Sequence, residues 1–352
     1  MVSGADDFHL NVWDVEQKRL VKSFDSTNGG HSDGIRLLIR LRDDYAASFS
    51  VDKTVKIWNF TKANFMNKDE TDSQLINTLD SNKGGHTDAV IAGTLINGGY
   101  NYLATGSADR TVKLWDISNL NDIKLKMTLN AHDNIVSYLV YLENGYLASA
   151  SYDRTVKIWD INLGKLKYKF DRTNGGHNNS VGTLALLENG YLASCSSLFQ
   201  QLPGTIKVWD IIQGKLKYTF NITNGGHAGY VWDLAALNDG YLASVSEDTT
   251  VKIWDITQGK LKYTFDEKNG GHKSMVWTSL SLGNDFYATG AGDLYGGLGE
   301  LKIWNVNKGK LEYTFDKDNG GHKSRIYSFA LFDNGDFASG SVDKTIKIWD
   351  QN

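Results

Sequence analysis

Short runs of alternating hydrophobic and polar residues recur in a fixed order along the chain. The cleanest copy is HDNIVSYLVYLENGYLASASYDRTVKIWD at 132–160, followed by KLKYKF. Period-two alternation in short segments rich in Val, Ile, Tyr and Thr is typical of β-strands. Asn-Gly-type turns separate the first two runs of a copy, and such turns suit tight hairpins. We therefore expect four antiparallel strands in this copy, at 135–142, 146–150, 155–160 and 165–170.

The third run of each copy ends in Trp. These residues are Trp13, Trp58, Trp115, Trp159, Trp209, Trp254, Trp304 and Trp349, spaced by 45, 57, 44, 50, 45, 50 and 45 residues. A period in the mid-forties with four strands per repeat is typical of a β-propeller. The repeats would share one continuous core, so we expect an all-β chain with a single domain over 1–352.

The first and last copies are incomplete, and this bears on the number of blades. Residues 1–24 resemble the end of one copy, and the last copy, 322–350, lacks a fourth strand. We expect seven four-stranded blades, in which Arg19–Phe24 completes the C-terminal blade and closes the ring, since closure removes open sheet edges. Residues 1–14 would then be a duplicate overhang. The alternative is eight blades.

Three stretches depart from the repeat. A long connector spans 59–76, and two insertions at 196–204 and 293–300 replace or lengthen a Ser-x-Asp turn. Their roles stay open at this point.

Composition and charge narrow the functional classes. Net charge is −4, and Lys and Arg are spread through every repeat, so we expect no nucleic-acid partner. The N-terminus shows no signal-peptide pattern, no apolar run is long enough to span a membrane, and Cys195 is the one cysteine. These features predict an intracellular protein and favour the cytoplasm, with the nucleus as the alternative.

The repeated Gly-His and Trp-Asp pairs resemble the WD40-repeat family of β-propellers. Gly-His occurs at His31, His86, His177, His227, His272 and His322, with Ala131-His132 in the remaining copy. Two copies end in Trp-Asn, at Asn59 and Asn305, in place of Trp-Asp. The resemblance covers essentially the whole chain.

The resemblance implies a buried hydrogen-bonded tetrad of Asp, His, Ser or Thr, and Trp in each blade. Carried onto this sequence, the tetrads are Asp52–His31–Ser48–Trp58, Asp109–His86–Thr105–Trp115, Asp153–His132–Ser149–Trp159, Asp248–His227–Ser244–Trp254, Asp293–His272–Thr289–Trp304 and Asp343–His322–Ser339–Trp349. One copy has His177, Ser194 and Trp209 but no Asp before Thr205. Each donor in such a chain meets an acceptor, so the groups brace the blade.

The resemblance assigns the repeated His, Ser and Asp residues to the tetrads, so few reactive side chains remain as candidates for catalysis or metal binding. Single repeated His residues lack metal-ligand spacing, and no group of reactive side chains departs from the repeat. We therefore predict a non-enzymatic chain with no metal and no cofactor.

In the family, the residue five positions after the His faces the mouth of the central channel on the top rim. Here these residues are Arg36, Ile91, Ser137, Gly182, Trp232, Trp277 and Tyr327. The middle residues of the Ser-x-Asp turns, including Tyr152 and Glu247, neighbour this rim. We expect Arg36, Tyr152, Trp232, Glu247, Trp277 and Tyr327 to bind a partner, and an Arg or Lys side chain is one candidate ligand. The alternative is that these large side chains only fill the channel.

Together these features predict a protein-interaction scaffold that binds a peptide or loop of a partner protein, within a larger complex, at the top rim. A sensor or regulatory portion of a longer protein is the second interpretation. An enzyme built on a propeller is the third.

Overall fold

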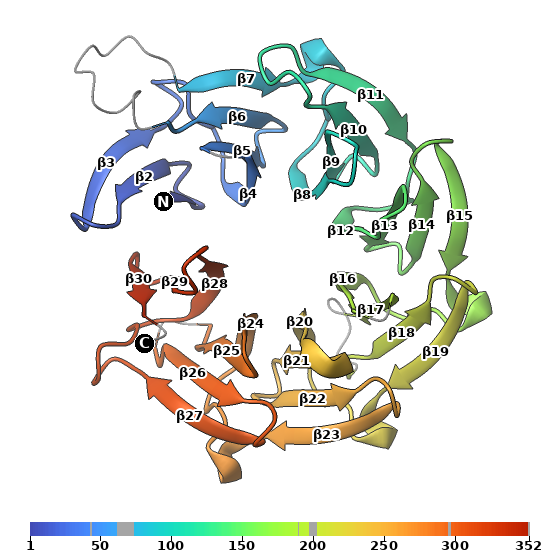
Figure 1. The fold of residues 1–352 in the computed structure, drawn as a ribbon, viewed down its shortest axis with the longest axis vertical. Helices are drawn as coiled ribbons and strands as arrows, with labels where there is room; N and C mark the ends of the chain where they lie inside the picture. The colour runs from blue at the N-terminus through green and yellow to red at the C-terminus, as the bar shows by residue number, and fades with distance from the viewer. Residues whose placement is uncertain (43, 62–73, 189, 197–202, 295–296, 351–352) are drawn as a thin grey trace. The chain divides into compact units, whose positions relative to one another are not determined.

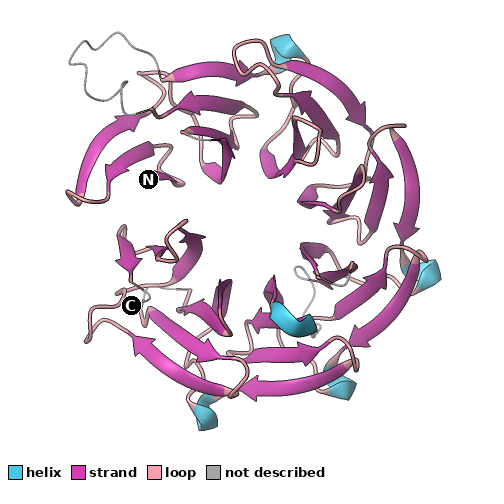
Figure 2. Ribbon diagram, viewed as in Figure 1, coloured by secondary structure: helices cyan, strands magenta, loops and turns pink. Residues whose placement is uncertain are grey.

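The computed structural model describes residues 1–352 except 43, 62–73, 189, 197–202, 295–296 and 351–352. Parts of the 59–76 connector and of the insertions at 196–204 and 293–300 therefore lie outside the described residues. The chain divides into two compact units, Met1–Lys169 and Phe170–Asn352. The described residues of each unit are built from antiparallel strands, joined by turns and a few 3-10 helices (Figure 2).

The first unit holds four sheets whose strands follow chain order (Figure 1). They are β1 (Val2–Gly4), β2 (Leu10–Asp14) and β3 (Arg19–Phe24); β4 (Ile35–Arg42), β5 (Tyr45–Ser50), β6 (Val55–Asn59) and β7 (Leu75–Leu79); β8 (Val90–Ile96), β9 (Tyr102–Ser107), β10 (Val112–Asp116) and β11 (Lys124–Leu129); and β12 (Val136–Tyr141), β13 (Tyr146–Ser151), β14 (Val156–Asp160) and β15 (Lys165–Phe170).

The second unit also holds four sheets in chain order. They are β16 (Val181–Leu186), β17 (Tyr191–Ser196), β18 (Ile206–Asp210) and β19 (Lys215–Phe220); β20 (Val231–Ala236), β21 (Tyr241–Ser246), β22 (Val251–Asp255) and β23 (Lys260–Phe265); β24 (Val276–Gly283), β25 (Phe286–Ala291), β26 (Glu300–Asn305) and β27 (Lys310–Phe315); and β28 (Ile326–Leu331), β29 (Phe337–Ser341) and β30 (Ile346–Trp349). The first strands of consecutive sheets contact one another within each unit.

The described residues thus form eight sheets, six of four strands and two of three. The eight-blade alternative is confirmed, and the preferred count of seven is wrong. The reason lies in residues 1–14, which form β1 and β2 rather than an overhang. β2 pairs with β1 through Val2↔Val12 and with β3 through Leu10↔Phe24, so Arg19–Phe24 has a local partner and belongs to the first sheet instead of completing the last one.

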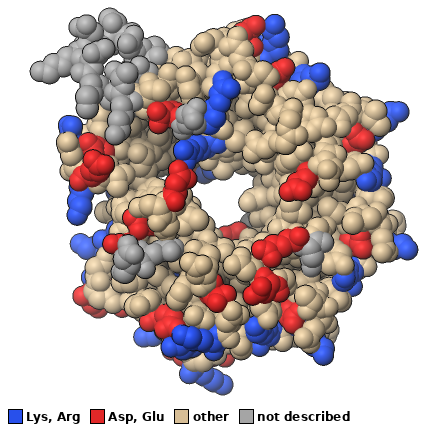
Figure 3. All heavy atoms as spheres, in the orientation of Figure 1, with Lys and Arg blue, Asp and Glu red and all other residues tan. Residues whose placement is uncertain are grey.

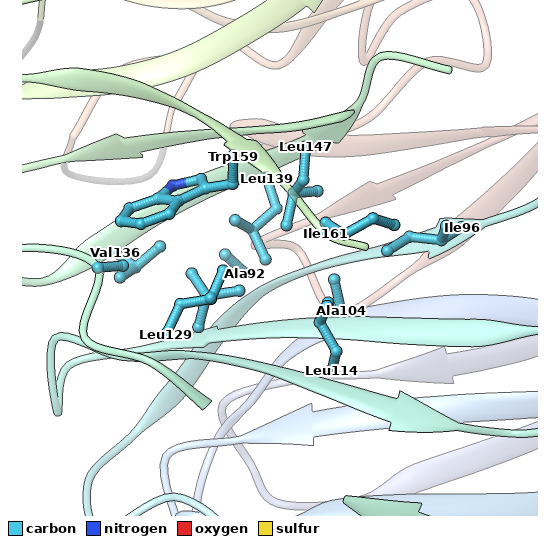
Figure 4. Packing of buried hydrophobic residues seen from close by; sticks show 12 residues of the cluster. Ala92, Ile96, Ala104, Leu114, Leu129, Val136, Leu139, Leu147, Trp159 and Ile161 are labelled. Carbon is cyan, nitrogen blue, oxygen red and sulfur yellow. The ribbon is translucent and has the colours of Figure 1, made fainter. Parts of the chain in front are cut away.

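Apolar side chains fill the space between consecutive sheets. Figure 4 shows this packing in the first unit, where Ala104 and Leu114 of one sheet lie in the same cluster as Leu139 and Leu147 of the next. All four are at least 95% buried. Burying a Leu or Ile side chain stabilises the fold by roughly 1.5–3 kcal/mol, so each sheet depends on its neighbour for its core.

The last residue of a fourth strand often stacks on the Trp of the next sheet. Phe220 lies 4.3 Å from Trp254 and Phe265 lies 4.3 Å from Trp304, measured between ring centroids. Phe24 at the end of β3 also packs against Trp58, at 5.0 Å, but with the ring planes tilted by 46°. Because of this contact and the β2–β3 pairing, the N-terminal strands pack against the next sheet as the other sheets do.

Four loops between sheets use the Asp-x-x-Asn-Gly-Gly sequence to make a turn, at 25–30, 171–176, 266–271 and 316–321. The Asp171 side chain accepts from the Thr173 amide at 2.9 Å and caps the 3-10 helix η2 (Arg172–Asn174), while Gly175 ends it at φ 87°. A Cβ on Gly176 would lie 2.4 Å from the Asp171 backbone. The first glycine therefore supplies a left-handed conformation and the second permits a close backbone approach.

The first strand of each complete sheet, and of the last sheet, carries a bulge near its start. In β20 the pairing with β21 jumps from Val231↔Ser246 to Asp233↔Val245, which leaves Trp232 as the extra residue. The same shift falls on Trp277 in β24 and on Tyr327 in β28. A bulge re-aims the extra side chain, so the residue five after each His leaves the ladder pattern and becomes available for contacts along the strand starts.

Candidate functional site

The Asp, His, hydroxyl and Trp side chains form continuous hydrogen-bonded chains. In the β12–β15 sheet, His132 Nδ1 lies 2.8 Å from Asp153 Oδ2, and His132 Nε2 lies 2.7 Å from Ser149 Oγ. Trp159 Nε1 donates to the same hydroxyl at 2.9 Å. The same set of contacts occurs at His31, His86, His227 and His322 with the expected partners.

Burial sets the charge state of these groups. Desolvation lowers the pKa of His132, although its hydrogen bond to Asp153 acts in the opposite direction. Burial alone would raise the pKa of Asp153, but the hydrogen bonds from His132 and Thr155 hold it well below its usual range. An ionised carboxylate thus accepts from a neutral imidazole at neutral pH. The polar groups of this tetrad are all paired, which suits bracing of the sheet.

The tetrad assignment of Asp293 is wrong. His272 Nδ1 lies 3.1 Å from Glu300 Oε2, whereas Asp293 Oδ1 accepts from the Gly297 amide at 2.8 Å. Glu300 is the first residue of β26, and its longer side chain supplies the carboxylate from there.

In the β16–β19 sheet, none of the described residues supplies this carboxylate to the imidazole. His177 Nε2 lies 2.8 Å from Ser194 Oγ, and Trp209 Nε1 donates to that hydroxyl at 2.8 Å. Among the described residues, His177 Nδ1 meets only the Thr205 hydroxyl, at 3.1 Å. Burial lowers the pKa of His177 to about 3, with the Lys207 ammonium as a further cause.

In the second unit, the predicted rim aromatics lie in one continuous row. The ring centroids of Trp232 and Trp277 are 4.6 Å apart, with the planes 27° from parallel. Tyr327 packs edge-on against Trp277 at 5.7 Å. The Trp rings are half-buried, and Tyr327 is 49% exposed. The bulges on β20, β24 and β28 therefore bring side chains from three sheets into a single surface.

Two further residues join this row that the repeat pattern did not single out. Tyr230 packs edge-on against Trp232 at 6.0 Å, and the Arg325 guanidinium lies 4.6 Å from the Trp277 ring centroid and 4.3 Å from that of Tyr327. Both stand three residues after a His. The residues three and five after the His lie on either side of the first residue of the strand. An aromatic or basic residue three after the His could therefore have been identified from the sequence as a neighbour of the rim residue. We call Tyr230, Trp232, Trp277, Arg325 and Tyr327 the aromatic row.

The remaining rim residues have separate surroundings. Glu247 lies beside the row, since its amide donates to Tyr230 O at 2.9 Å and its carboxylate accepts from the Tyr230 amide at 3.4 Å. Arg36 and Tyr152 belong to the first unit. Arg36 forms an ion pair with Asp6 at 2.7 Å, and Tyr152 is half-buried, with its amide bonded to Ile135 O at 3.1 Å.

Two further features of the described residues bear on function: the distribution of charged side chains and the grouping of possible metal ligands. Acidic and basic side chains are interspersed on the face that Figure 3 shows. The residues that the structure describes contain no group of three or more His, Cys, Asp or Glu placed to hold a metal ion. Their helices are single short turns, none with the length and apolarity needed to cross a bilayer.

Known proteins contain repeats similar to those of this chain. The family described as WD domain, G-beta repeat, matches residues 73–116, 123–160, 214–255 and 309–350. The ribosome biogenesis protein ytm1 of Botryotinia fuckeliana is 29% identical over 115 residues. That match covers 33% of this chain and 23% of the relative, so the shared region is about a quarter of the relative's length.

Solved structures show the same fold. The computationally designed protein Ika8 is 28% identical, with a TM-score of 0.76, and the match covers 99% of this chain and 92% of Ika8. The WD40 β-propeller domain of Doa1 is 23% identical, with a TM-score of 0.64 over 92% of this chain and 95% of that domain. Four of the repeats thus match the WD repeat model, and the chain shares the β-propeller fold of these solved structures.

Proposed function

We propose that this chain is a non-catalytic scaffold that binds a peptide or loop of a partner protein at the aromatic row. The observation that carries the proposal is the continuous contact from Tyr230 through Trp232 and Trp277 to Tyr327. Aromatic side chains and Arg dominate the binding energy of protein interfaces because they offer large rigid surfaces with polar edges.

Arg325 changes the kind of partner that this surface suits. Its guanidinium already covers the faces of Trp277 and Tyr327, where an incoming Arg or Lys was expected to stack. A bound basic side chain would also meet the like charge of Arg325. We therefore propose that the partner segment presents acceptors, either backbone carbonyls or an acidic side chain, to Arg325, and that its apolar side chains pack on the exposed edge of Tyr327.

Two unsatisfied donors support a ligand of this kind. Trp232 Nε1 and Arg325 Nε are buried and have no hydrogen-bond partner among the described residues. Leaving such a donor unpaired costs roughly 1–3 kcal/mol. Small rotations of these side chains against an incoming carbonyl would recover part of that free energy, which favours binding over simple space filling.

Affinity purification with mass spectrometry tests the proposal. The wild type is compared with the Trp232→Ala/Trp277→Ala double variant and with Tyr313→Ala. Tyr313 is 58% exposed on β27 and has no part in the row, so it is a matched control for loss of a surface aromatic. We expect the double variant, checked for folding by circular dichroism, to lose partners that Tyr313→Ala retains. Identical partner sets for all three proteins would contradict the proposal.

The relative's name suggests where to begin looking. By analogy with a ribosome biogenesis protein, we propose that the partner is a component of a multi-protein assembly, in the cytoplasm or the nucleus, and that nucleic acid does not bind this chain directly. Fractionation of the purified material with and without nuclease separates protein contacts from those bridged by RNA.

A further inference from the structure

Each tetrad whose carboxylate is an Asp holds it with the same set of donors. In the β20–β23 sheet, Asp248 Oδ2 lies 3.1 Å from His227 Nδ1 and accepts from the Ala228 amide at 2.7 Å. Asp248 Oδ1 accepts from the Thr250 hydroxyl at 2.6 Å and from its amide at 3.0 Å. An imidazole, a hydroxyl and two amides therefore form a carboxylate-binding site within the sheet.

The β16–β19 sheet keeps most of these donors, but no carboxylate of the described residues lies among them. His177 Nδ1 and the Thr205 hydroxyl lie 3.1 Å apart, and the Asn178 amide, the counterpart of Ala228, meets no acceptor among the described residues. The Thr205 amide donates to Ser196 Oγ at 3.1 Å. The sequence at 197–202, SLFQQL, contains neither Asp nor Glu, so these residues have no carboxylate to offer.

A buried lysine beside this position also lacks an anion. Lys207 is 9% exposed, and among the described residues its ammonium meets only the Thr219 hydroxyl, at 3.3 Å. The equivalent Lys302 lies 3.9 Å from Glu300 Oε1. Burial lowers the pKa of Lys207, and no described acidic group acts against it, whereas Asp248 partly offsets burial at Lys252. A desolvated ammonium without a counter-ion is unfavourable and would be stabilised by an anion.

An open cavity lies among the described residues at this place. It has a volume of about 300 Å³ and is lined by Asn178, Ser196, Thr205 and Lys207 together with residues of the neighbouring loop. These are the residues that would surround the missing Asp. The cavity is large enough for a carboxylate with a short side chain attached.

We propose that this cavity binds the carboxylate of a ligand in place of the missing Asp, either an acidic side chain of a peptide or a small organic acid. The carboxylate accepts from the Asn178 amide and the Thr205 hydroxyl, and it pairs with Lys207. Glu300 gives an internal precedent, because it reaches His272 from the position that corresponds to Thr205 in a sheet whose turn is also altered. The site is separate from the aromatic row and does not depend on its function.

The test uses the full chain and defined probes in calorimetric titrations. Acetyl-Gly-Asp-Gly-amide is compared with its Asn analogue and with acetate. We expect the Asp peptide to bind roughly ten-fold or more tightly than the Asn peptide, since charge-assisted hydrogen bonds are the stronger kind. Acetate that competes with the Asp peptide would identify a site for any carboxylate, and acetate that does not compete would identify one for acidic side chains of peptides.

Two variants, Thr205→Glu and Lys207→Met, test whether the peptide binds in this cavity, and Ile212→Glu is the control. Thr205→Glu places the chain's own carboxylate in the site, by analogy with Glu300, and should abolish Asp-peptide binding while raising the melting temperature. Ile212→Glu adds the same charge at a residue that is 81% exposed, and should bind like the wild type. Lys207→Met should also lose binding, which covers the case in which Thr205→Glu fails to fold. Equal binding of the Asp and Asn peptides, or unchanged binding by Thr205→Glu or Lys207→Met, would overturn the proposal.

Discussion

The guanidinium of Arg325 lies 4.6 Å from the ring centroid of Trp277, on the adjacent sheet. The two residues come from the starts of neighbouring first strands, Trp277 on β24 and Arg325 directly before β28. A cation over an aromatic face contributes about 1 kcal/mol when partly desolvated. The contact therefore ties the last two sheets together at the aromatic row and decides which ligands can stack there.

Replacing Arg325 tests this contact. We expect Arg325→Gln to lower the free energy of unfolding by about 1 kcal/mol, because the cation–π contacts with Trp277 and Tyr327 are lost. Tryptophan fluorescence of the folded protein should change as well. Urea denaturation measures the first effect, and Lys323→Gln, which removes the same charge from an exposed site two residues away, is the control. Equal effects of the two substitutions would mean that stacking contributes nothing.

The tetrad predicts a much larger effect from a buried histidine. We expect His132→Ala to cost about 2–4 kcal/mol, because it leaves the Asp153 carboxylate and the Ser149 hydroxyl without their partner and opens a cavity. His9→Ala removes a histidine whose side chain is 43% exposed and should cost less than about 0.5 kcal/mol. Guanidinium denaturation of both variants gives the comparison. A cost below about 1 kcal/mol for His132→Ala would contradict the bracing role.

The exchange of Asp293 for Glu300 as the partner of His272 is also testable. We expect Glu300→Gln to destabilise the chain by about 1–2 kcal/mol, because the charge that His272 and Lys302 face is removed. Asp293→Asn should have less than half that effect, since the Asp293 carboxylate accepts from the Gly297 amide and an Asn side-chain oxygen can do the same. Thermal unfolding ranks the two variants, and the opposite order would restore Asp293 to the tetrad.

His177 should make the fold sensitive to mild acid. Its pKa of about 3 in the folded chain lies below the 6.5 of an unperturbed histidine. Between these values the unfolded chain binds more protons than the folded chain, so stability falls as the pH falls. From pH 7 to pH 5 this residue accounts for a loss of about 2 kcal/mol. We expect His177→Gln to show a correspondingly shallower loss in urea denaturation across that range. A slope equal to that of the wild type would show that His177 does not titrate in this way.

Much of the architecture was predictable because it rests on repeated local signals. Turns such as Glu143–Gly145 and the Trp-ended runs define strands, and seven identically placed histidines define the bracing. The blade count was not predictable by the same means. Residues 1–24 resemble the end of one copy, but Val2–Gly4 is too short to show from its pattern whether it pairs within a sheet of its own, so seven and eight blades both fitted the sequence.

The row of aromatic side chains was predicted in part. Trp232, Trp277 and Tyr327 were named because the resemblance to the WD40-repeat family implies that the residue five after each His faces the rim, and the three rings do lie in one row. That they bind a partner stays a prediction. Arg325 was missed because only one copy has a cation at the offset of three, and repetition cannot reveal a feature that occurs once. The Asp293 assignment failed because a lengthened turn changes which carboxylate reaches His272, and sequence spacing alone does not report how a turn folds back.

Site-specific photo-crosslinking at the aromatic row tests the proposed partner site directly. With p-benzoylphenylalanine in place of Tyr327, and separately in place of Tyr313, the chain is exposed to its native partners and the linked peptides are identified by mass spectrometry. Both positions are exposed, at 49% and 58%, so both probes can reach a partner. We expect the probe at Tyr327 to link to one defined partner segment and the probe at Tyr313 not to link to it. Labelling of that segment from Tyr313 with none from Tyr327 would contradict a partner site at the aromatic row.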